Sequence, residues 1–308
     1  MRTVWTMGFV AAAALAFLFP DFIVFRFNQA VIWSIALLGL VILCGTSGQF
    51  SFAQAALYGV GGYTMALVGN LYWALPLAVV VGYGAGYGLG RVTGVHGVWT
   101  QALVTYAVAI AFPQLLRWRP IEHWTGGVQG LYLDLPVAPA VTGLTGDQWS
   151  YLLSLALLAL GVWLAHNIIT SRSGRALMAA RDDELAAWGQ GIDVAHVRAV
   201  ASGLASAYLA LAGGLGALQI GFVGPTGYSF ALSVQMLFGL VVGGMNSVAG
   251  AIMGGLFLQF FPDVVAGLGK GLSNLLYAVL LVAAIVIMPN GIAGALSRLG
   301  KRREFSNP

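Results

Sequence analysis

The sequence predicts an all-α polytopic membrane protein with about 10 transmembrane segments, within a range of about 8–10. Three observations predict this fold class. Of the 308 residues, 59% are hydrophobic and only 8% are charged, which lies outside the composition of soluble domains. The apolar residues gather in stretches of about 20, the length that crosses a bilayer. The 43 glycines are typical of membrane helices that pack closely through small residues.

The segments follow one another with short connections. We predict that they cover, in chain order, 4–20, 29–46, 50–69, 71–90, 97–116, 149–169, 197–217, 229–244, 247–262 and 273–289. The first follows Arg2 as a signal peptide would, but no small-residue cleavage site precedes Pro20, so we interpret it as a helix. The fourth is nearly free of charge and rich in glycine. The eighth and ninth are short and interrupted by glycine, which predicts a helical hairpin or a re-entrant pair.

The basic residues predict the orientation in the membrane. Ten segments place both termini on one side. If that side is the cytoplasm, the inside segments contain ten of the Lys and Arg residues and the outside segments contain four. Because cytoplasmic loops are enriched in Lys and Arg, the sequence predicts cytoplasmic termini, an external loop over 117–148 and a cytoplasmic segment over 172–196.

Two stretches hint at an internal repeat. GQFSFAQAALYGVGG (48–62) and GYSFALSVQMLFGLVVGG (227–244) share an SFA start and later glycines. They open the third and eighth segments, so they would run in opposite directions, as in a 5+5 inverted repeat. A chance match is the alternative.

The segment 172–196 concentrates charge, because Arg181 to Asp193 holds four of the ten acidic residues. A helix over 173–189 would place four apolar residues in one arc of about 100°: Leu177, Met178, Leu185 and Trp188. Arg181 would lie inside that arc and Glu184 at its edge, where it could meet a basic group of a partner. This mixed face favours docking on a protein over lying on lipid, and a solvated loop is the alternative. Gly191 predicts a left-handed stop.

Several motifs resemble known permeases. GRALMAARDDELAAWGQGID (174–193) resembles the cytoplasmic coupling segment of ABC importer permeases. The chain as a whole resembles the branched-chain amino acid permease family, the longer of its two permease types. The matching stretches are LCGTSGQFSFAQAALYGVGGYTMAL (43–67), TGGVQGL (125–131), GALQIGFVGPTGYSFALSVQMLFGLVVGGMNSVAGAIMGG (216–255) and PNGIAGAL (289–296). Departures from the family pattern at Gln54, Gln129 and Trp188 leave the substrate open.

The resemblance implies a single transmembrane permease domain over 1–308 in the bacterial inner (plasma) membrane. It implies import of branched-chain or related amino acids, with amides and urea as alternatives. The implied partners are a second permease subunit, forming a heterodimer or a homodimer, two ATP-binding subunits and an external solute-binding protein. The residues that would couple to the ATPase are Arg181, Glu184, Ala186, Ala187 and Gly191.

Other function classes find little support in the sequence. Lys270 in GLGKGL lacks the spacing of a phosphate-binding loop, so we expect ATP to be bound by partner subunits and no cofactor in this chain. The four histidines are scattered, so we expect no metal site, and no catalytic constellation indicates an enzyme. The basic residues lie between segments, which does not favour nucleic-acid binding. An ATP-independent secondary carrier or channel for small polar solutes is the alternative function.

Uncharged polar residues within the segments are candidates for the solute passage. They are Gln49, Ser51, Gln54, Tyr58, Tyr228, Ser229 and Gln235. Amides and hydroxyls could match the hydrogen bonds of a zwitterion without holding it tightly, whereas the alternative is polar contact between helices. In the external loop, Thr125, Gly126 and Gly127 form either a turn or part of a docking face for the binding protein.

Overall fold

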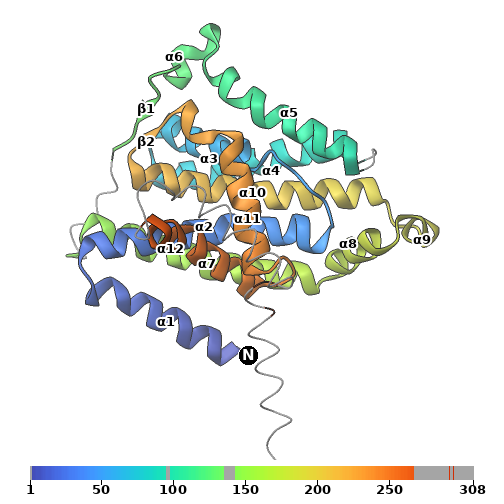
Figure 1. Cartoon of the computed structure of the whole chain (residues 1–308), viewed down its shortest axis with the longest axis horizontal. Coiled ribbons are helices and arrows are strands. Elements are labelled where there is room, and N and C mark those ends of the chain that lie inside the picture. The colour runs from blue at the N-terminus through green and yellow to red at the C-terminus, as the bar shows by residue number, and fades with distance from the viewer. Residues whose placement is uncertain (1, 95–97, 135–142, 267–290, 292–293, 295–308) are drawn as a thin grey trace, which may run out of the picture.

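The computed structural model (Figure 1) describes residues 2–94, 98–134, 143–266, 291 and 294. Helices make up most of this part of the chain, and two short strands, β1 (Leu131–Tyr132) and β2 (Phe222–Val223), pair antiparallel. Among the described residues, five helices are long and apolar enough to cross a membrane. The predicted all-α polytopic fold is therefore confirmed.

The first nine predicted segments coincide with helices, and the tenth, 273–289, lies outside the described residues. In order, they are α1 (Arg2–Leu18), α2 (Asp21–Leu40) continued by the π-helix η1 (Val41–Thr46), α3 (Gln54–Val68), α4 (Leu71–Thr93), α5 (Val98–Leu116), α7 (Gly146–Thr170), α10 (Val194–Ile220), α11 (Phe230–Gly243) and α12 (Val248–Ala266). The second differs most from its prediction, because α2 starts at Asp21 and not at residue 29. The third is shorter than predicted, since α3 starts only at Gln54 and has 15 residues.

The last two of these helices confirm the predicted hairpin. α11 and α12 are joined by the short turn 244–247 and pack against each other. Glycines allow this contact, because a Cβ at Gly243 would lie 2.1 Å from the carbonyl oxygen of Gly250. The two helices therefore approach each other backbone to backbone.

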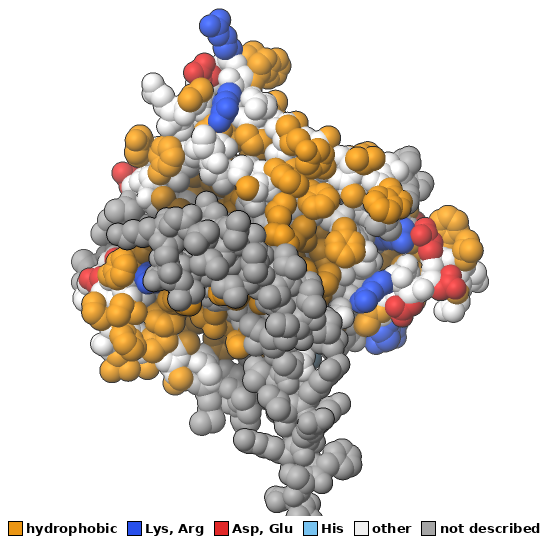
Figure 2. Space-filling model, viewed as in Figure 1, with side chains coloured by type: hydrophobic (Ala, Val, Ile, Leu, Met, Phe, Trp, Pro, Cys, Tyr) orange, Lys and Arg blue, Asp and Glu red, His pale blue; other side chains and the backbone are white. Residues whose placement is uncertain are grey.

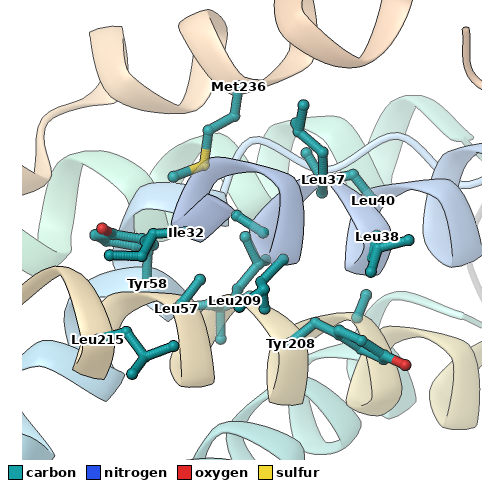
Figure 3. Close-up of a cluster of buried hydrophobic side chains, with 14 of the residues drawn as sticks. Ile32, Leu37, Leu38, Leu40, Leu57, Tyr58, Tyr208, Leu209, Leu215 and Met236 are labelled. Carbon is teal, nitrogen blue, oxygen red and sulfur yellow. The ribbon is translucent and has the colours of Figure 1, made fainter. Parts of the chain in front are cut away.

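α10 is the central helix of the fold (Figure 1), and it packs against α4, α3 and α2. α2 and α10 are buried along most of their length, whereas only about a third or less of α4, α5 and α7 is buried. Figure 3 shows part of the core between them, in which Ile32 of α2, Leu209 of α10 and Met236 of α11 come together. The exposed helices therefore surround a buried pair, α2 and α10.

A stripe of small residues joins α4 to α10. The buried residues of α4 recur every fourth position and include Ala74, Ala78, Gly82, Gly86 and Gly90. Residues four apart lie on one face of a helix. At Gly86 a Cβ would lie 2.0 Å from the Oγ of Ser206 on α10. The glycine content noted in the sequence thus provides close helix contact, as expected for helices in lipid.

Charged and apolar surfaces are separated along the molecule. Figure 2 shows basic and acidic side chains gathered at the end with residues 172–193 and near residues 117–122, with apolar side chains between them over α5. Exposed apolar residues of α5 include Trp99, Leu103 and Ile110. An apolar band between two charged ends is the arrangement that a bilayer requires.

The two SFA stretches meet in the structure. The backbone N–H of Ala55 donates to the Oγ of Ser233 at 2.9 Å, and the rings of Phe52 and Phe230 lie 5.6 Å apart. The starts of α3 and α11 are therefore neighbours. An inverted repeat over the whole chain stays a prediction.

We expect Gly86→Val to lower the free energy of unfolding by about 1–3 kcal/mol, because overpacking forces tightly packed groups apart. Gly88→Val is the matched control, since a Cβ at Gly88 would meet nothing within 4 Å. Thermal unfolding of the purified variants in detergent measures the difference. Equal melting temperatures for the two variants would contradict the α4–α10 contact.

Candidate coupling segment and solute passage

The charged segment lies at one end of the molecule and forms two short helices, α8 (Arg172–Asp182) and α9 (Glu184–Gly189). The prediction of one continuous helix over 173–189 is therefore wrong. Asp183 has extended backbone angles, φ −153° and ψ 110°, and its side chain accepts a hydrogen bond from the N–H of Ala186. Asp183 thus acts as the N-cap of α9, a role that aspartate fills better than a helix interior.

The break also separates the predicted apolar stripe, so that prediction is wrong as well. Leu177 on α8 is 2% exposed and faces the bundle, whereas Leu185 and Trp188 on α9 are 76% and 58% exposed. Ala187 holds α9 in place through a small cluster with Ala180 and Val194. The exposed apolar surface of this segment therefore belongs to α9.

Gly191 follows α9 in the left-handed conformation that the sequence predicts, with φ +79°. Its N–H donates to the carbonyl oxygen of Trp188 at 2.9 Å, and the N–H of Ile192 donates to that of Ala187. These two bonds satisfy carbonyl groups at the helix end. The chain then enters α10 at Val194.

Glu184 is paired within the chain, and its contact with an ATPase stays a prediction. Its Oε2 accepts a hydrogen bond from Nη2 of Arg198 at 3.0 Å, and the two side chains are 42% and 16% exposed. A pair with this exposure stabilises a protein by about 0–1 kcal/mol. The pair therefore fixes the direction of α9 against α10 more than it stabilises the fold.

The remaining members of the predicted coupling set occupy different surfaces. Ala186 is exposed on α9, and Ala187 is buried beneath it. Arg181 does not share the face of Leu185, because its guanidinium turns toward the membrane bundle and donates to Gly45 and Asn246. The exposed surface of this segment therefore lies on α9, whereas α8 contacts the bundle through Arg181.

Gln49 is a fully bonded link between elements. Its Nε2 donates to the Oγ of Ser47 at 2.6 Å and to the carbonyl oxygen of Arg198 at 3.0 Å. Its Oε1 accepts from Nε2 of Gln101 at 2.8 Å. The side chain is 2% exposed. This geometry favours the interhelical alternative for Gln49, and the sequence analysis missed its partner Gln101.

Ser51 and Gln54 shape the start of α3. The Oγ of Ser51 accepts from the N–H of Ala53 at 3.2 Å, and Nε2 of Gln54 donates to the carbonyl oxygen of Ser51. The Oε1 of Gln54 is buried and finds no hydrogen-bond partner among the described residues. Both side chains therefore serve the local turn, and Gln54 retains one free acceptor.

Tyr58 and Tyr228 come together in a buried aromatic cluster, with ring centroids 6.2 Å apart. Trp33 stacks on Tyr58 at 5.8 Å, Tyr63 lies 5.9 Å from Tyr228, and Phe112 meets Tyr228 edge-on at 6.3 Å. The Oη of Tyr63 is buried, and no residue in the described part of the chain forms a hydrogen bond with it. The sequence indicated two of these five rings. The other three are aromatic residues in apolar stretches, which carry no signal by themselves.

An open groove of about 510 Å³ on α5 adjoins this cluster through Phe112. Its other lining residues are Val108, Ala111, Gln114, Leu115 and Trp118. Ser229 is exposed just before α11, and Gln235 is half-buried along it. The other predicted passage residues form two groups, polar links at the start of α3 and an aromatic cluster that reaches the surface of α5.

The glycine-rich stretch that the sequence predicts to be external forms a turn held by hydrogen bonds. It follows η2 (Arg119–Ile121) and α6 (Glu122–Thr125), and Gly126 and Gly127 have φ of +70° and +53°. The Oγ1 of Thr125 donates to the carbonyl oxygen of Leu116 at 2.7 Å. β1 then pairs with β2, which follows α10. The turn alternative is confirmed, and a docking role stays a prediction.

The turn at 125–131 lies away from the charged segment (Figure 1), because α9 precedes α10 and β2 follows it. Among the described residues, no three of His, Cys, Asp and Glu lie close enough to share a metal ion. What the arrangement offers chemically is hydrogen bonding and aromatic surface.

Comparison with known proteins places the chain among permeases. A family model described as "Branched-chain amino acid transport system / permease component" matches residues 22–287. The chain is 28% identical over 298 residues to the high-affinity branched-chain amino acid transport system permease protein LivM of Salmonella typhimurium, covering 86% of this chain and 68% of that protein. The LivM protein of Escherichia coli K12 is 27% identical over 295 residues, covering 85% and 68%.

A second group of relatives has a different cargo in its name. The autoinducer 2 import system permease protein LsrC of Escherichia coli K12 / DH10B is 26% identical over 315 residues, covering 96% of this chain and 90% of that protein. No solved structure matches the chain.

We expect Gly191→Val to weaken retention of a docked ATPase, because a side chain in the left-handed conformation costs about 1–2 kcal/mol and tilts α9. The cost is conformational, since a Cβ at Gly191 would meet nothing within 4 Å. Gly189→Val is the control, with the same open space and no positive φ. Co-purification with the ATP-binding subunits measures retention. Equal retention for both variants would rule out a role for the turn.

Proposed function

Because the chain belongs to the family of branched-chain amino acid transport system permease components, we propose that it is the membrane-spanning subunit of an ABC importer. In this proposal it forms the passage for branched-chain or related amino acids, and partner subunits bind and hydrolyse ATP. The chain itself is a transport subunit with no ATPase site of its own.

The observation that carries the proposal is the form of α9. It projects from the end of the bundle, carries the exposed side chains of Leu185 and Trp188, and is held by Ala187 and the Glu184–Arg198 pair. An exposed apolar pair on a short, braced helix suits insertion into a cleft of a soluble protein. A carrier without a motor has no use for such a projection.

The other partners are assigned to the remaining surfaces. The groove on α5 is apolar and adjoins the aromatic cluster, so we assign this face to the second permease subunit, with the passage between the two. The turn at 125–131 is assigned to the solute-binding protein, because Trp124, Val128 and Tyr132 are exposed around it. Large exposed aromatic residues are frequent anchors in protein interfaces.

The aromatic cluster supports a small, largely apolar solute. Rings of Tyr58, Tyr63 and Tyr228 offer apolar surface with hydroxyl groups at the edge, which suits a branched side chain beside a polar head. Autoinducer 2 is the second candidate, because the LsrC relatives match nearly the whole chain. Amides and urea stay alternatives from the sequence.

The protein is a membrane protein, and we propose that the segment 172–196 faces the cytoplasm together with the amino terminus. The exposed basic residues Arg172 and Arg175 of α8 support this orientation, since cytoplasmic segments are enriched in such residues. The same orientation exposes the turn at 125–131 to the outside, and the carboxyl terminus lies outside the described residues.

We expect uptake of radiolabelled leucine into proteoliposomes only when both permeases, the ATP-binding subunits, the solute-binding protein and ATP are present. Replacing ATP by a non-hydrolysable analogue is the control. Uptake without the ATP-binding subunits would support the carrier alternative. ATP-dependent uptake of autoinducer 2 in place of leucine would keep the importer and change its solute.

Single cysteines at Ser173 and Gln129 test the orientation in a Cys44→Ala background, since Cys44 is the one native cysteine. Both positions are exposed. In intact spheroplasts, a membrane-impermeant maleimide should label Gln129→Cys, and it should label Ser173→Cys only after permeabilisation. The reverse pattern would invert the orientation, and labelling of both in intact spheroplasts would contradict opposite faces.

A further inference from the structure

We propose that Arg181 is a positioning residue that transmits movement of the coupling segment into the membrane bundle. This inference rests on the proposed function, because it needs a motor that moves α8 and α9. Arg181 belongs to the segment expected to grip the ATPase, yet its guanidinium lies against the bundle. α9 receives the force from the ATPase, and Arg181 passes it to the membrane bundle.

The contacts of Arg181 join three elements. Its Nη1 donates to the carbonyl oxygen of Gly45 in η1, and the same nitrogen lies 3.2 Å from Oδ1 of Asn246 in the turn between α11 and α12. α8 is thereby connected both to the end of α2 and to the α11–α12 hairpin. These contacts lie 136 and 65 residues apart in the chain, respectively, so they are tertiary links.

The acceptors suit a cation. Carbonyl groups in the last turn of a helix lack intrahelical partners and carry partial negative charge. A guanidinium that donates to such a carbonyl makes a hydrogen bond stronger than a neutral one. Gly45 belongs to the last residues of η1, so its carbonyl is a group that requires a partner.

The chain also makes room for the stem of Arg181. A Cβ at Gly48 would lie 2.7 Å from Cγ of Arg181, and Gly48 has φ +68°. The two acceptor segments touch as well, because a Cβ at Gly45 would lie 2.1 Å from the carbonyl oxygen of Met245. Arg181 therefore sits beside a backbone contact between η1 and the turn at 244–247.

A second attachment holds the same stretch from α10. Gln49, four residues after Gly45, donates to the carbonyl oxygen of Arg198, and the side chain of Arg198 pairs with Glu184. Residues 45–49 are thus held by α8 through Arg181 and by α10 through Gln49. A movement of α8 and α9 relative to α10 must therefore change the conformation of residues 45–49.

The links continue toward the passage. The stretch leads into the start of α3, where Ala55 bonds Ser233 of α11, and α11 follows the cluster residue Tyr228. Spatial continuity of this kind does not by itself prove coupling. The decisive measurement is therefore of energetic dependence between Arg181 and its acceptors.

The test uses the complete reconstituted transporter and measures solute taken up per ATP hydrolysed. Arg181→Met keeps the stem over Gly48 and removes the guanidinium. We expect the ATP-binding subunits to stay bound through α9, hydrolysis to continue, and uptake per ATP to fall about tenfold, a size consistent with losing charge-assisted hydrogen bonds. Arg181→Lys should restore part of it, since an ammonium lacks the fork of a guanidinium.

Arg175→Met is the matched control on the same helix, because Arg175 is exposed and donates to the carbonyl oxygen of Thr170. It should leave uptake per ATP unchanged. Asn246→Ala removes one acceptor and keeps Arg181, so we expect an intermediate loss. The double variant Arg181→Met/Asn246→Ala should be no worse than Arg181→Met alone, because linked residues are not additive.

Normal uptake per ATP in Arg181→Met would overturn the proposal, as would additive losses in the double variant. Loss of ATPase binding in Arg181→Met would also overturn it, because Arg181 would then be a docking residue. These outcomes differ from failure of the proposed function, which would show as wild-type uptake that does not need the ATP-binding subunits.

Discussion

Inside lipid, helices gain nothing from the hydrophobic effect when they associate, so they hold together through close packing and hydrogen bonds. In this chain, that packing centres on α10. A Cβ at Gly61 of α3 would lie 1.8 Å from the carbonyl oxygen of Ala210, and a Cβ at Gly213 would lie 1.8 Å from that of Tyr58. The backbones of α3 and α10 are therefore in direct contact. This contact helps to set the positions of the elements that pack against α10.

The same environment determines where polar side chains lie. A polar group without a partner is costly in an apolar medium, so most buried ones are matched across helices. The hydroxyl of Tyr208 donates to the carbonyl oxygen of Gly161 at 2.8 Å, and Gln49 joins α10 and α5. Six buried side-chain atoms of the described residues have no hydrogen-bond partner. Two of them, Oε1 of Gln54 and Oη of Tyr63, lie among the residues assigned to the passage or next to it, where a passing solute could supply partners.

Sequence reasoning located the helices because length and apolar character are local properties, and it placed the left-handed Gly191 because few other residues adopt that conformation. It did not find the break at Asp183, since the helical period of 173–189 outweighed the capping preference of one aspartate. Nor could it orient Arg181 or pair Glu184, because their partners Gly45, Asn246 and Arg198 are brought to them only by the tertiary fold.

The residues of the candidate passage could also be predicted only in part. Tyr58 and Tyr228 could be selected as polar residues in apolar stretches, yet Trp33, Tyr63 and Phe112 joined them only through packing. The α5 groove could not be predicted, since nothing in the sequence marks its lining residues between Val108 and Trp118 as a hollow in the surface.

The π-helix η1 has a consequence for how sequences of this family can diverge. Each helical residue turns the chain by about 100°, and a π-helix is a wider turn that marks functional positions in many proteins. Deleting one residue within 41–46 would swing the carbonyl of Gly45 away from Arg181 and the amide of Gln49 away from Gln101. The number of residues between Trp33 and Gln49 therefore determines whether these contacts form. We therefore expect insertions and deletions that accumulate during evolution to lie outside this interval, in segments whose length can change without rotating the end of a helix.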